Sequence, residues 1–260
     1  MSSPVAKKRA CPLCGCTETA LFLSGRACLA QETFDWVRCK GCGVIRVSPL
    51  PTPEQIEQMY SDEAYVDSDS IAGNVAGRRA IENLIYEDAR NQLDRLSEYV
   101  TGGRLLDVGC AHGEFLQAAS DIGYVAEGLE PNPQMAAAAS RRGFKVRQCT
   151  IEEAVLEPHA FELINLNHVL EHVCRPREII EKVTEALTSG GVVHIQVPTA
   201  LNSLFYKLPV HLVRAGRRIG IDGIWQGTKP PYHLWEFTPR LIRYLLEEAD
   251  LQVGYSRASE

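Results

Sequence analysis

Short apolar runs alternate with amphipathic stretches along the second half of the chain. From residue 103 onward, the pattern predicts strands at about 104–108, 124–130, 144–149, 161–167 and 192–198. Helices are predicted between them at about 113–122, 133–142 and 176–188. Alternation at this period is typical of a parallel sheet with helices on both faces. The sequence therefore predicts a doubly wound α/β fold for this part of the chain.

The segment before residue 103 predicts helices. Apolar side chains recur every three or four residues over 81–100, and the pattern stops at Gly102-Gly103, so we expect one amphipathic helix there. Several prolines interrupt regular structure near residue 50, and a shorter helix is expected after this break, at about 53–60. The polar residues 61–77 between the two helices predict a connector.

Four cysteines near the N-terminus form two C-x2-C pairs. The first pair is Cys11 and Cys14, and the second is Cys39 and Cys42. Two such turns bring four thiolates to one tetrahedral zinc ion. A closed four-thiolate shell leaves no open coordination position, so we expect the zinc to be structural. With short strands between the pairs, the segment predicts a small zinc-ribbon-like domain.

Composition and charge favour a globular protein of a reducing compartment. Six of the nine cysteines fall before residue 43, which favours a local metal site over a disulfide scaffold, and we expect Cys16 and Cys28 to stay free. No segment has the apolar core of a signal peptide or the roughly 18 apolar residues of a membrane span, so we expect a cytoplasmic protein. The net charge is −6; residues 1–47 carry seven basic and three acidic residues, or +4, which leaves −10 elsewhere and disfavours nucleic acid as a partner.

The turn after the first strand of the α/β part carries the candidate chemistry. It reads LLDVGCAHGEF over residues 105–115. A dinucleotide fingerprint has glycine at the first, third and sixth positions, but these positions hold Gly109, Ala111 and Glu114. Asp107 and Glu114 would also repel a pyrophosphate at the start of the helix. The turn therefore predicts a ligand other than a dinucleotide.

This turn resembles motif I of the class I S-adenosylmethionine-dependent methyltransferases, D-x-G-x-G-x-G, with Asp107, Gly109, Ala111 and Gly113 at the motif positions. The resemblance implies a Rossmann-like methyltransferase domain that binds S-adenosylmethionine. A carboxylate beside the loop suits the ammonium and sulfonium groups of that cofactor, and Glu130 offers two acceptors to its ribose hydroxyls. The further cofactor-binding positions that the resemblance implies are Cys110, Pro131, Cys149, Thr150 and Asn167.

The resemblance covers most of the chain. Residues 161–198 are similar to the family's fourth strand, helix and fifth strand, and residues 251–256 would be its sixth strand. The usual seventh strand is missing, so an uncovered sheet edge is expected. CPLCG and CKGCG resemble a subgroup with a zinc module ahead of the methyltransferase domain. The expected domains are a zinc-ribbon-like domain at 1–47, a helical linker at 48–102, and a methyltransferase domain at 103–260 with an insertion at 201–231.

Three histidines and one acid are candidates for the catalytic site on the acceptor side. A helical turn after the fourth strand would place His168, Glu171 and His172 on one face, and His233 follows later in YHLWEF. A histidine could act as the general base. Alternatively, the four side chains hold a second, divalent metal, similar to an E-x-x-E-H set in certain class I O-methyltransferases, although His168 in place of the leading acid disfavours Mg²⁺. In the third interpretation, Glu171 and His172 only fix the loop.

The insertion at 201–231 combines five basic residues and one acid with an apolar helical face. A lid for an anionic acceptor, a solvated helix face and a membrane-surface contact all fit this pattern. The leading hypothesis is a methyltransferase that acts on a small molecule, anionic or sugar-like, in a biosynthetic pathway. The alternatives are an RNA methyltransferase that contacts RNA through the zinc module, and a non-catalytic zinc-ribbon interaction protein.

Overall fold

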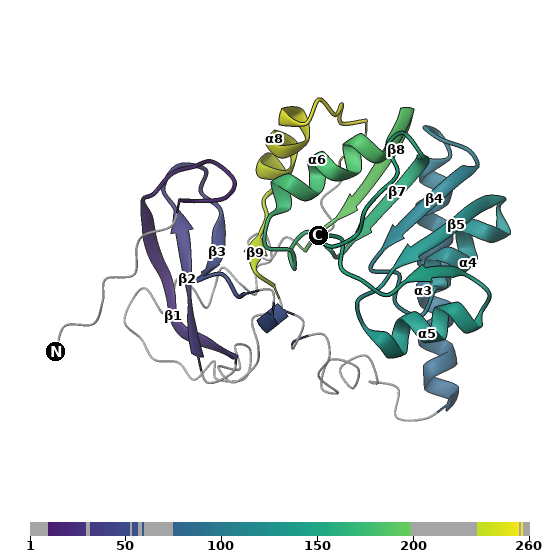
Figure 1. The fold of residues 1–260 in the computed structure, drawn as a ribbon, viewed down its shortest axis with the longest axis horizontal. Coiled ribbons are helices and arrows are strands. Elements are labelled where there is room, and N and C mark those ends of the chain that lie inside the picture. Colours follow the sequence, from purple (N-terminus) through teal and green to yellow (C-terminus); the bar gives the residue numbers. More distant parts are fainter. Residues whose placement is uncertain are drawn as a thin grey trace. The chain divides into compact units, whose positions relative to one another are not determined.

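The computed structural model describes residues 10–29, 32–52, 54–56, 59, 75–198, 233–254 and 256, and Figure 1 shows their elements. The chain divides into two compact units. The first contains Met1–Pro51, Leu170–Ile180 and Val197–Glu260, and the second contains Thr52–Val169 and Glu181–Gln196. The domain boundaries expected at residues 47 and 102 stay a prediction, and the insertion at 201–231 lies outside the described residues.

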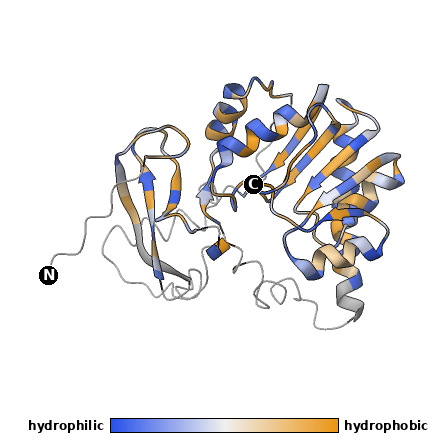
Figure 2. Ribbon diagram, viewed as in Figure 1, coloured by the Kyte–Doolittle hydropathy of each residue, from blue (hydrophilic) through white to orange (hydrophobic). Residues whose placement is uncertain are grey.

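The second unit is built on a five-stranded parallel sheet with the order β6-β5-β4-β7-β8. Its strands are β4 (Gly103–Val108), β5 (Tyr124–Leu129), β6 (Lys145–Arg147), β7 (Phe161–Asn167) and β8 (Leu187–Gln196). All five were predicted from the sequence pattern, and Figure 2 shows the apolar residues along the central strands. The Rossmann-like fold is confirmed, and its first strand, β4, lies at the centre of the sheet.

Helices α3 (Val75–Leu96), α4 (Glu114–Asp121) and α5 (Pro133–Arg141) share one hydrophobic core with the sheet. Leu93 of α3 and Leu116 of α4 are fully buried there against Leu105 and Leu163. The apolar stripe predicted for α3 is only half covered, since Leu84 is 70% exposed. The stripe therefore packs against the core near its C-terminal end alone.

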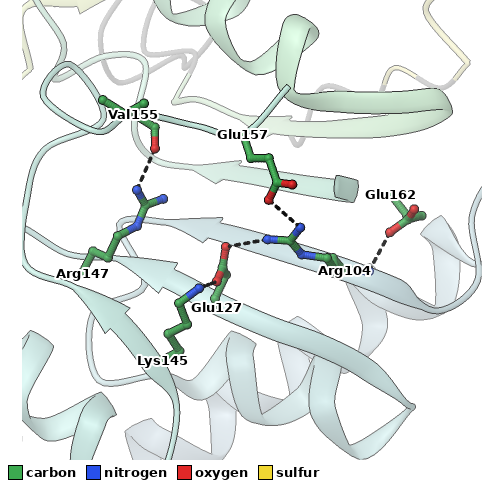
Figure 3. A network of polar contacts seen from close by, with 7 residues as sticks. All are labelled: Arg104, Glu127, Lys145, Arg147, Val155, Glu157 and Glu162. Carbon is green, nitrogen blue, oxygen red and sulfur yellow. Dashed lines mark hydrogen bonds and ion pairs between the residues drawn. The ribbon is translucent and has the colours of Figure 1, made fainter. Parts of the chain in front are cut away.

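The opposite face of the sheet carries a network of ion pairs across neighbouring strands, drawn in Figure 3. The Arg104 guanidinium lies 2.9 Å from Glu157 and 3.5 Å from Glu127, and Glu127 also pairs with Lys145 on β6. Arg104 lies over the Phe161 ring, 4.8 Å from its centroid. Exposed pairs of this kind contribute little individually. Their arrangement gives this part of the sheet a polar outer surface.

The first unit is built on a four-stranded antiparallel sheet with the order β1-β2-β3-β9. Strands β1 (Thr19–Leu29) and β2 (Glu32–Cys39) contain the short strands predicted between the cysteine pairs. Strands β3 (Ile45–Ser48) and β9 (Trp235–Glu236) were not predicted. Because β9 comes from near the other end of the chain, the cysteine-rich segment and the C-terminal segment form one sheet.

Helix α6 (Pro176–Ala186) begins in the first unit, which also contains α8 (Pro239–Glu248). The Thr238 hydroxyl accepts a hydrogen bond from Leu241 N and so caps α8. The sixth strand expected at 251–256 is wrong for residues 251–254, which contain no strand. Asp250 has a φ of 59° and Leu251 N donates to Leu246 O, so these residues close the helix instead. No helix among the described residues is long and apolar enough to cross a membrane.

Candidate functional site

Backbone hydrogen bonds to the end of β5 hold the loop after β4. Gly109 N and Cys110 N both donate to Leu129 O, at 2.8 and 3.0 Å. Gly113 caps α4 with a φ of 89°, and Ala111 also has a positive φ, of 45°. This backbone makes a tight turn of small residues at the carboxyl end of the central strand, which is where open α/β sheets bind their ligands.

Glu130 joins this loop to the start of the next helix. Its Oε2 accepts from Ala111 N at 2.9 Å and its Oε1 accepts from Asn132 N at 2.8 Å. Asn132 in turn caps α5 by accepting from Gln134 N and Met135 N. A buried carboxylate therefore fixes both backbone turns.

Asp107 is buried one residue before the end of β4. Its Oδ1 accepts from Asn165 Nδ2 on β7 at 2.7 Å. Burial raises the pKa of Asp107 to about 7, the Asn165 hydrogen bond opposes this rise, and the negative charges of Glu130 and Glu114 add to it. The charged groups that act on Asp107 are therefore both carboxylates, as in a site that binds a cation.

The segment after β6 is held by side chains on its own turn and on α6. Thr150 and Glu153 bond reciprocally, since Glu153 Oε2 accepts from Thr150 N at 3.0 Å and Thr150 Oγ1 accepts from Glu153 N at 3.3 Å. Lys182 Nζ donates to three carbonyls of this turn, those of Ile151, Glu152 and Ala154. Cys149 precedes the turn and is half-buried. The segment that contains the predicted cofactor-binding residues Cys149 and Thr150 therefore has a fixed backbone.

Glu171, His172 and His233 form a cluster in the first unit. Their ligating atoms lie within 4.8 Å of one another. His172 Nε2 is 3.9 Å from Glu171 Oε1, and the His172 and His233 rings meet edge-on with centroids 5.0 Å apart. Glu171 is fully buried. One carboxylate and two imidazoles in this arrangement fit a divalent transition metal or a hydrogen-bonded base.

His168 does not take part in the helical turn that the sequence predicted. It has a φ of 55°, and residues 168–173 contain turns but no helix. The physical reason is that His168 N donates to Gln196 O at 2.9 Å, which continues the β7–β8 pairing by one residue. His168 is exposed and belongs to the second unit, whereas the three clustered residues belong to the first.

Leu234, just before β9, and Trp235 on β9 support the turn of the Glu171 cluster. Leu234 N donates to Glu171 O at 2.6 Å, and Trp235 Nε1 donates to Val173 O at 2.7 Å. Trp235 is fully buried. On the same strand, burial raises the pKa of Glu236 to about 7, and the charge of Glu171 adds to this effect. The turn at 171–173 is therefore tied to a strand of the cysteine-rich sheet.

The four predicted cysteine ligands lie together. Cys11 Sγ is 3.9 Å from Cys42 Sγ, and Cys14 Sγ is 3.5 Å from Cys39 Sγ. Thiolates around a tetrahedral zinc with bonds of 2.3 Å lie about 3.8 Å apart, whereas a disulfide needs about 2.05 Å. The thiols are therefore spaced for zinc. Hydrogen bonding with Cys42 lowers the pKa of Cys11 to about 5 and raises the pKa of Cys42.

The chain was compared with protein families and with solved structures. The family described as a methyltransferase domain matches residues 81–255, which is more than half of the chain. The chain belongs to the methyltransferase-domain family. The match contains the loop after β4, Glu130 and all of the Glu171 cluster, while the four cysteines lie before it.

The curated relatives of this chain include enzymes of ubiquinone biosynthesis. It is 26% identical over 166 residues to the mitochondrial ubiquinone biosynthesis O-methyltransferase of Mus musculus, covering 59% of this chain and 42% of that protein. It is also 26% identical over 142 residues to the ubiquinone biosynthesis O-methyltransferase of a Caulobacter strain, covering 52% of this chain and 53% of that protein. The chain thus spans about half the length of the curated relatives it matches.

Solved structures share the fold of this chain. A SAM-dependent methyltransferase from Methanosarcina mazei has a TM-score of 0.52 at 16% identity and covers 64% of this chain and 87% of its own. Another from Leishmania major has a TM-score of 0.50 at 16% identity and covers 78% and 74%. At such identities the likeness shows the fold alone.

The residues around the methyltransferase loop suit S-adenosylmethionine. The roles predicted for Asp107 and Glu130 need carboxyl groups beside a loop of small residues, and both carboxyl groups are buried there. Asn167 Oδ1, at the end of β7, is buried and has no hydrogen-bond partner among the described residues. An orphaned buried acceptor at this edge suits a ligand that donates a hydrogen bond. Pro131 is half-buried beside Glu130, and the roles predicted for all of these residues stay predictions.

Sequence reasoning missed several residues that organise the site. Asn165 is a polar residue inside the apolar strand FELINLN, and this break in the pattern was a usable signal. Nothing in the sequence relates Lys182 to the turn after β6. Trp235 was equally hidden, because its strand has only two residues.

Proposed function

We propose that this protein transfers a methyl group from S-adenosylmethionine to a small-molecule acceptor. Membership of the methyltransferase-domain family supports the reaction. The observation that carries the proposal is the pair of buried carboxylates, Asp107 and Glu130, at the loop of small residues after β4. A phosphate-binding turn would instead present free N–H groups and no acid.

Each carboxylate has a distinct role in this proposal. Asp107 faces the amino group of the cofactor, and the carboxylate of Glu130 accepts hydrogen bonds from the ribose hydroxyls. When bound, S-adenosylmethionine supplies an electrophilic methyl group on a sulfonium. The protein then needs mainly to align an acceptor with that methyl group and to keep water out. Asn167, at the adjacent strand end, is positioned to contribute a further hydrogen bond.

A small-molecule acceptor agrees with the charge and with the relatives. The described residues around the loop are mainly acidic, and the chain outside residues 1–47 carries −10. Two curated relatives are O-methyltransferases of ubiquinone biosynthesis. An RNA acceptor would instead give salt-dependent binding to ribosomal RNA. A filter-binding titration at physiological salt distinguishes the two, because tight RNA binding would contradict the small-molecule assignment.

The four cysteines hold a structural zinc ion in this account. The metal would fix the turn that leads into β3, where Cys39 N donates to Val44 O at 2.9 Å. Strand β3 pairs with β9, and β9 holds the turn of Glu171. Arg177 on α6 adds a second link by donating to Leu13 O at 2.6 Å. The zinc module therefore braces the turn that carries Glu171.

The cluster of Glu171, His172 and His233 has two candidate roles. Either histidine could take a proton from the acceptor, with Glu171 orienting His172. The separation of the ligating atoms, within 4.8 Å, also favours a divalent transition metal. Metal analysis separates these roles: two metals per chain, reduced to one in His172→Ala, support the metal site, and one metal in both proteins supports the base.

Calorimetry with S-adenosylhomocysteine tests the proposed function. We expect one binding site per chain for this ligand and no binding of NADH. Glu130→Gln should weaken binding about tenfold, because an amide cannot replace a charge-assisted acceptor for two donors. Glu157→Gln, which alters an exposed acid paired with Arg104, is the matched control and should bind normally. No heat with the wild-type protein at high concentration would refute the proposal.

A further inference from the structure

A row of three polar side chains crosses the centre of the parallel sheet. Asp107 on β4 is the direct register partner of Asn165 on β7, and Asn165 is the partner of His194 on β8. Equivalent positions on neighbouring strands point to the same face, so the three side chains lie side by side. Asn165 Nδ2 donates to Asp107 Oδ1 at 2.7 Å, and His194 Nδ1 lies 2.7 Å from Asn165 Oδ1.

The row has one consistent direction of donation. An ionised Asp107 only accepts, so the Asn165 amide must turn its NH₂ toward it and its oxygen toward His194. His194 must then carry its proton on Nδ1. Burial lowers the pKa of His194 to about 4, the charge of Arg95 lowers it further and that of Asp88 opposes this, so the ring is neutral near pH 7. A neutral ring with Nδ1–H is the donor that the row requires.

Without the donor on His194, the side-chain amide of Asn165 could face Asp107 in either of two orientations. A buried amide can rotate by 180° and present its oxygen to Asp107, which favours a protonated carboxyl instead of a carboxylate. Asp107 is already close to that state, since its pKa is raised to about 7 by burial and by Glu130 and Glu114, while Glu114 is itself paired with Arg142. The orientation of the amide therefore decides whether the loop offers a negative charge.

We propose that His194 is a positioning residue for the cofactor, which acts through Asn165 to keep Asp107 as a hydrogen-bond acceptor for the cofactor's amino group. This inference rests on the proposed function, in which Asp107 faces that amino group. It adds two residues on β7 and β8 to the cofactor site, and neither belongs to the loop.

Two ligands that differ in the amino acid group isolate the effect of His194 on the binding of that group. S-adenosylhomocysteine carries the amino acid group, and 5′-methylthioadenosine lacks it but keeps the adenosine. We expect His194→Phe to weaken binding of the first ligand about fivefold, the scale of one lost hydrogen bond, and to leave binding of the second unchanged. His194→Gln retains an N–H donor and should recover most of the affinity. His159→Phe is the matched control, because His159 Nδ1 contacts Leu187 O of β8 outside the row.

The pH profile adds a readout that a structural role would not move. Affinity of the wild-type protein for S-adenosylhomocysteine should rise between about pH 6 and 8 as Asp107 loses its proton. His194→Phe should move the midpoint of this rise to higher pH, because the amide no longer favours the carboxylate. Equal loss of affinity for both ligands, or an unmoved midpoint, would overturn the proposal.

A measurement on the wild-type protein covers the case in which the variants do not fold. Nitrogen NMR of the histidine rings should show His194 as the neutral Nδ1–H tautomer at pH 7, and the Nε2–H tautomer would overturn the row. Failure of the proposed function looks different: the wild-type protein would then bind neither adenosine ligand, whatever the tautomer of His194.

Discussion

Gly113 gives a sharp test of how tightly the loop after β4 packs. It has a φ of 89°, and a Cβ placed there would lie 3.2 Å from Ala139 Cβ and 3.3 Å from Phe144 Cδ2. Gly113→Ala therefore has two costs: about 1 kcal/mol for a left-handed alanine, and about 1–3 kcal/mol for overpacking against the buried Ala139. We expect the free energy of unfolding to fall by about 2–4 kcal/mol.

Gly143→Ala is the matched control for the first cost. Gly143 has a φ of 97° and no atom within 4 Å of an added Cβ, so only the backbone cost of about 1 kcal/mol remains. Urea denaturation followed by circular dichroism gives both values. Gly113→Ala should also weaken S-adenosylhomocysteine binding, and Gly143→Ala should not. Equal losses of stability in the two variants would refute the close packing of this loop.

Three further predictions concern the zinc site, β9 and the buried acid. Cys39→Ser should remove the zinc found by metal analysis and Cys16→Ser should keep it, so equal zinc contents would contradict the ligand set. Trp235→Phe leaves the Val173 carbonyl without its donor and should lower the free energy of unfolding by about 1–3 kcal/mol; an unchanged urea midpoint would count against this bond. Because the folded pKa of Asp107 is raised to about 7, folding binds a proton between about pH 4 and 7, so this residue makes stability fall as pH rises through that window. In Asp107→Asn that fall should become shallower, and an identical pH profile would contradict the raised pKa.

The sequence predicted the parallel sheet well because its strands are continuous apolar runs. Buried parallel strands such as β4 and β7 leave this signature in any sequence. The cluster of four cysteines could also be predicted, since two C-x2-C pairs can bring four thiols together. The helical turn predicted at His168 was wrong, because His168 continues a strand pairing that only the folded sheet reveals.

The C-terminal segment shows why the remainder could not be predicted. Trp235 and Glu236 are too few to give an alternating pattern, and their partner strand lies nearly 190 residues earlier in the chain. Residues 251–254 do alternate, yet they close α8 and form no strand. Whether each of these segments forms a strand depends on a partner that is distant in the sequence. The row from Asp107 to His194 depends in the same way on which strands become neighbours.

Hydrogen–deuterium exchange with and without S-adenosylhomocysteine locates the cofactor site on the protein. We expect the ligand to slow amide exchange at three strand ends, in residues 107–114, 130–133 and 149–154, and to leave exchange in β1 and β2 unchanged. Saturating ligand with no protection at these strand ends, or protection confined to the cysteine-rich sheet, would contradict a cofactor site built on Asp107 and Glu130.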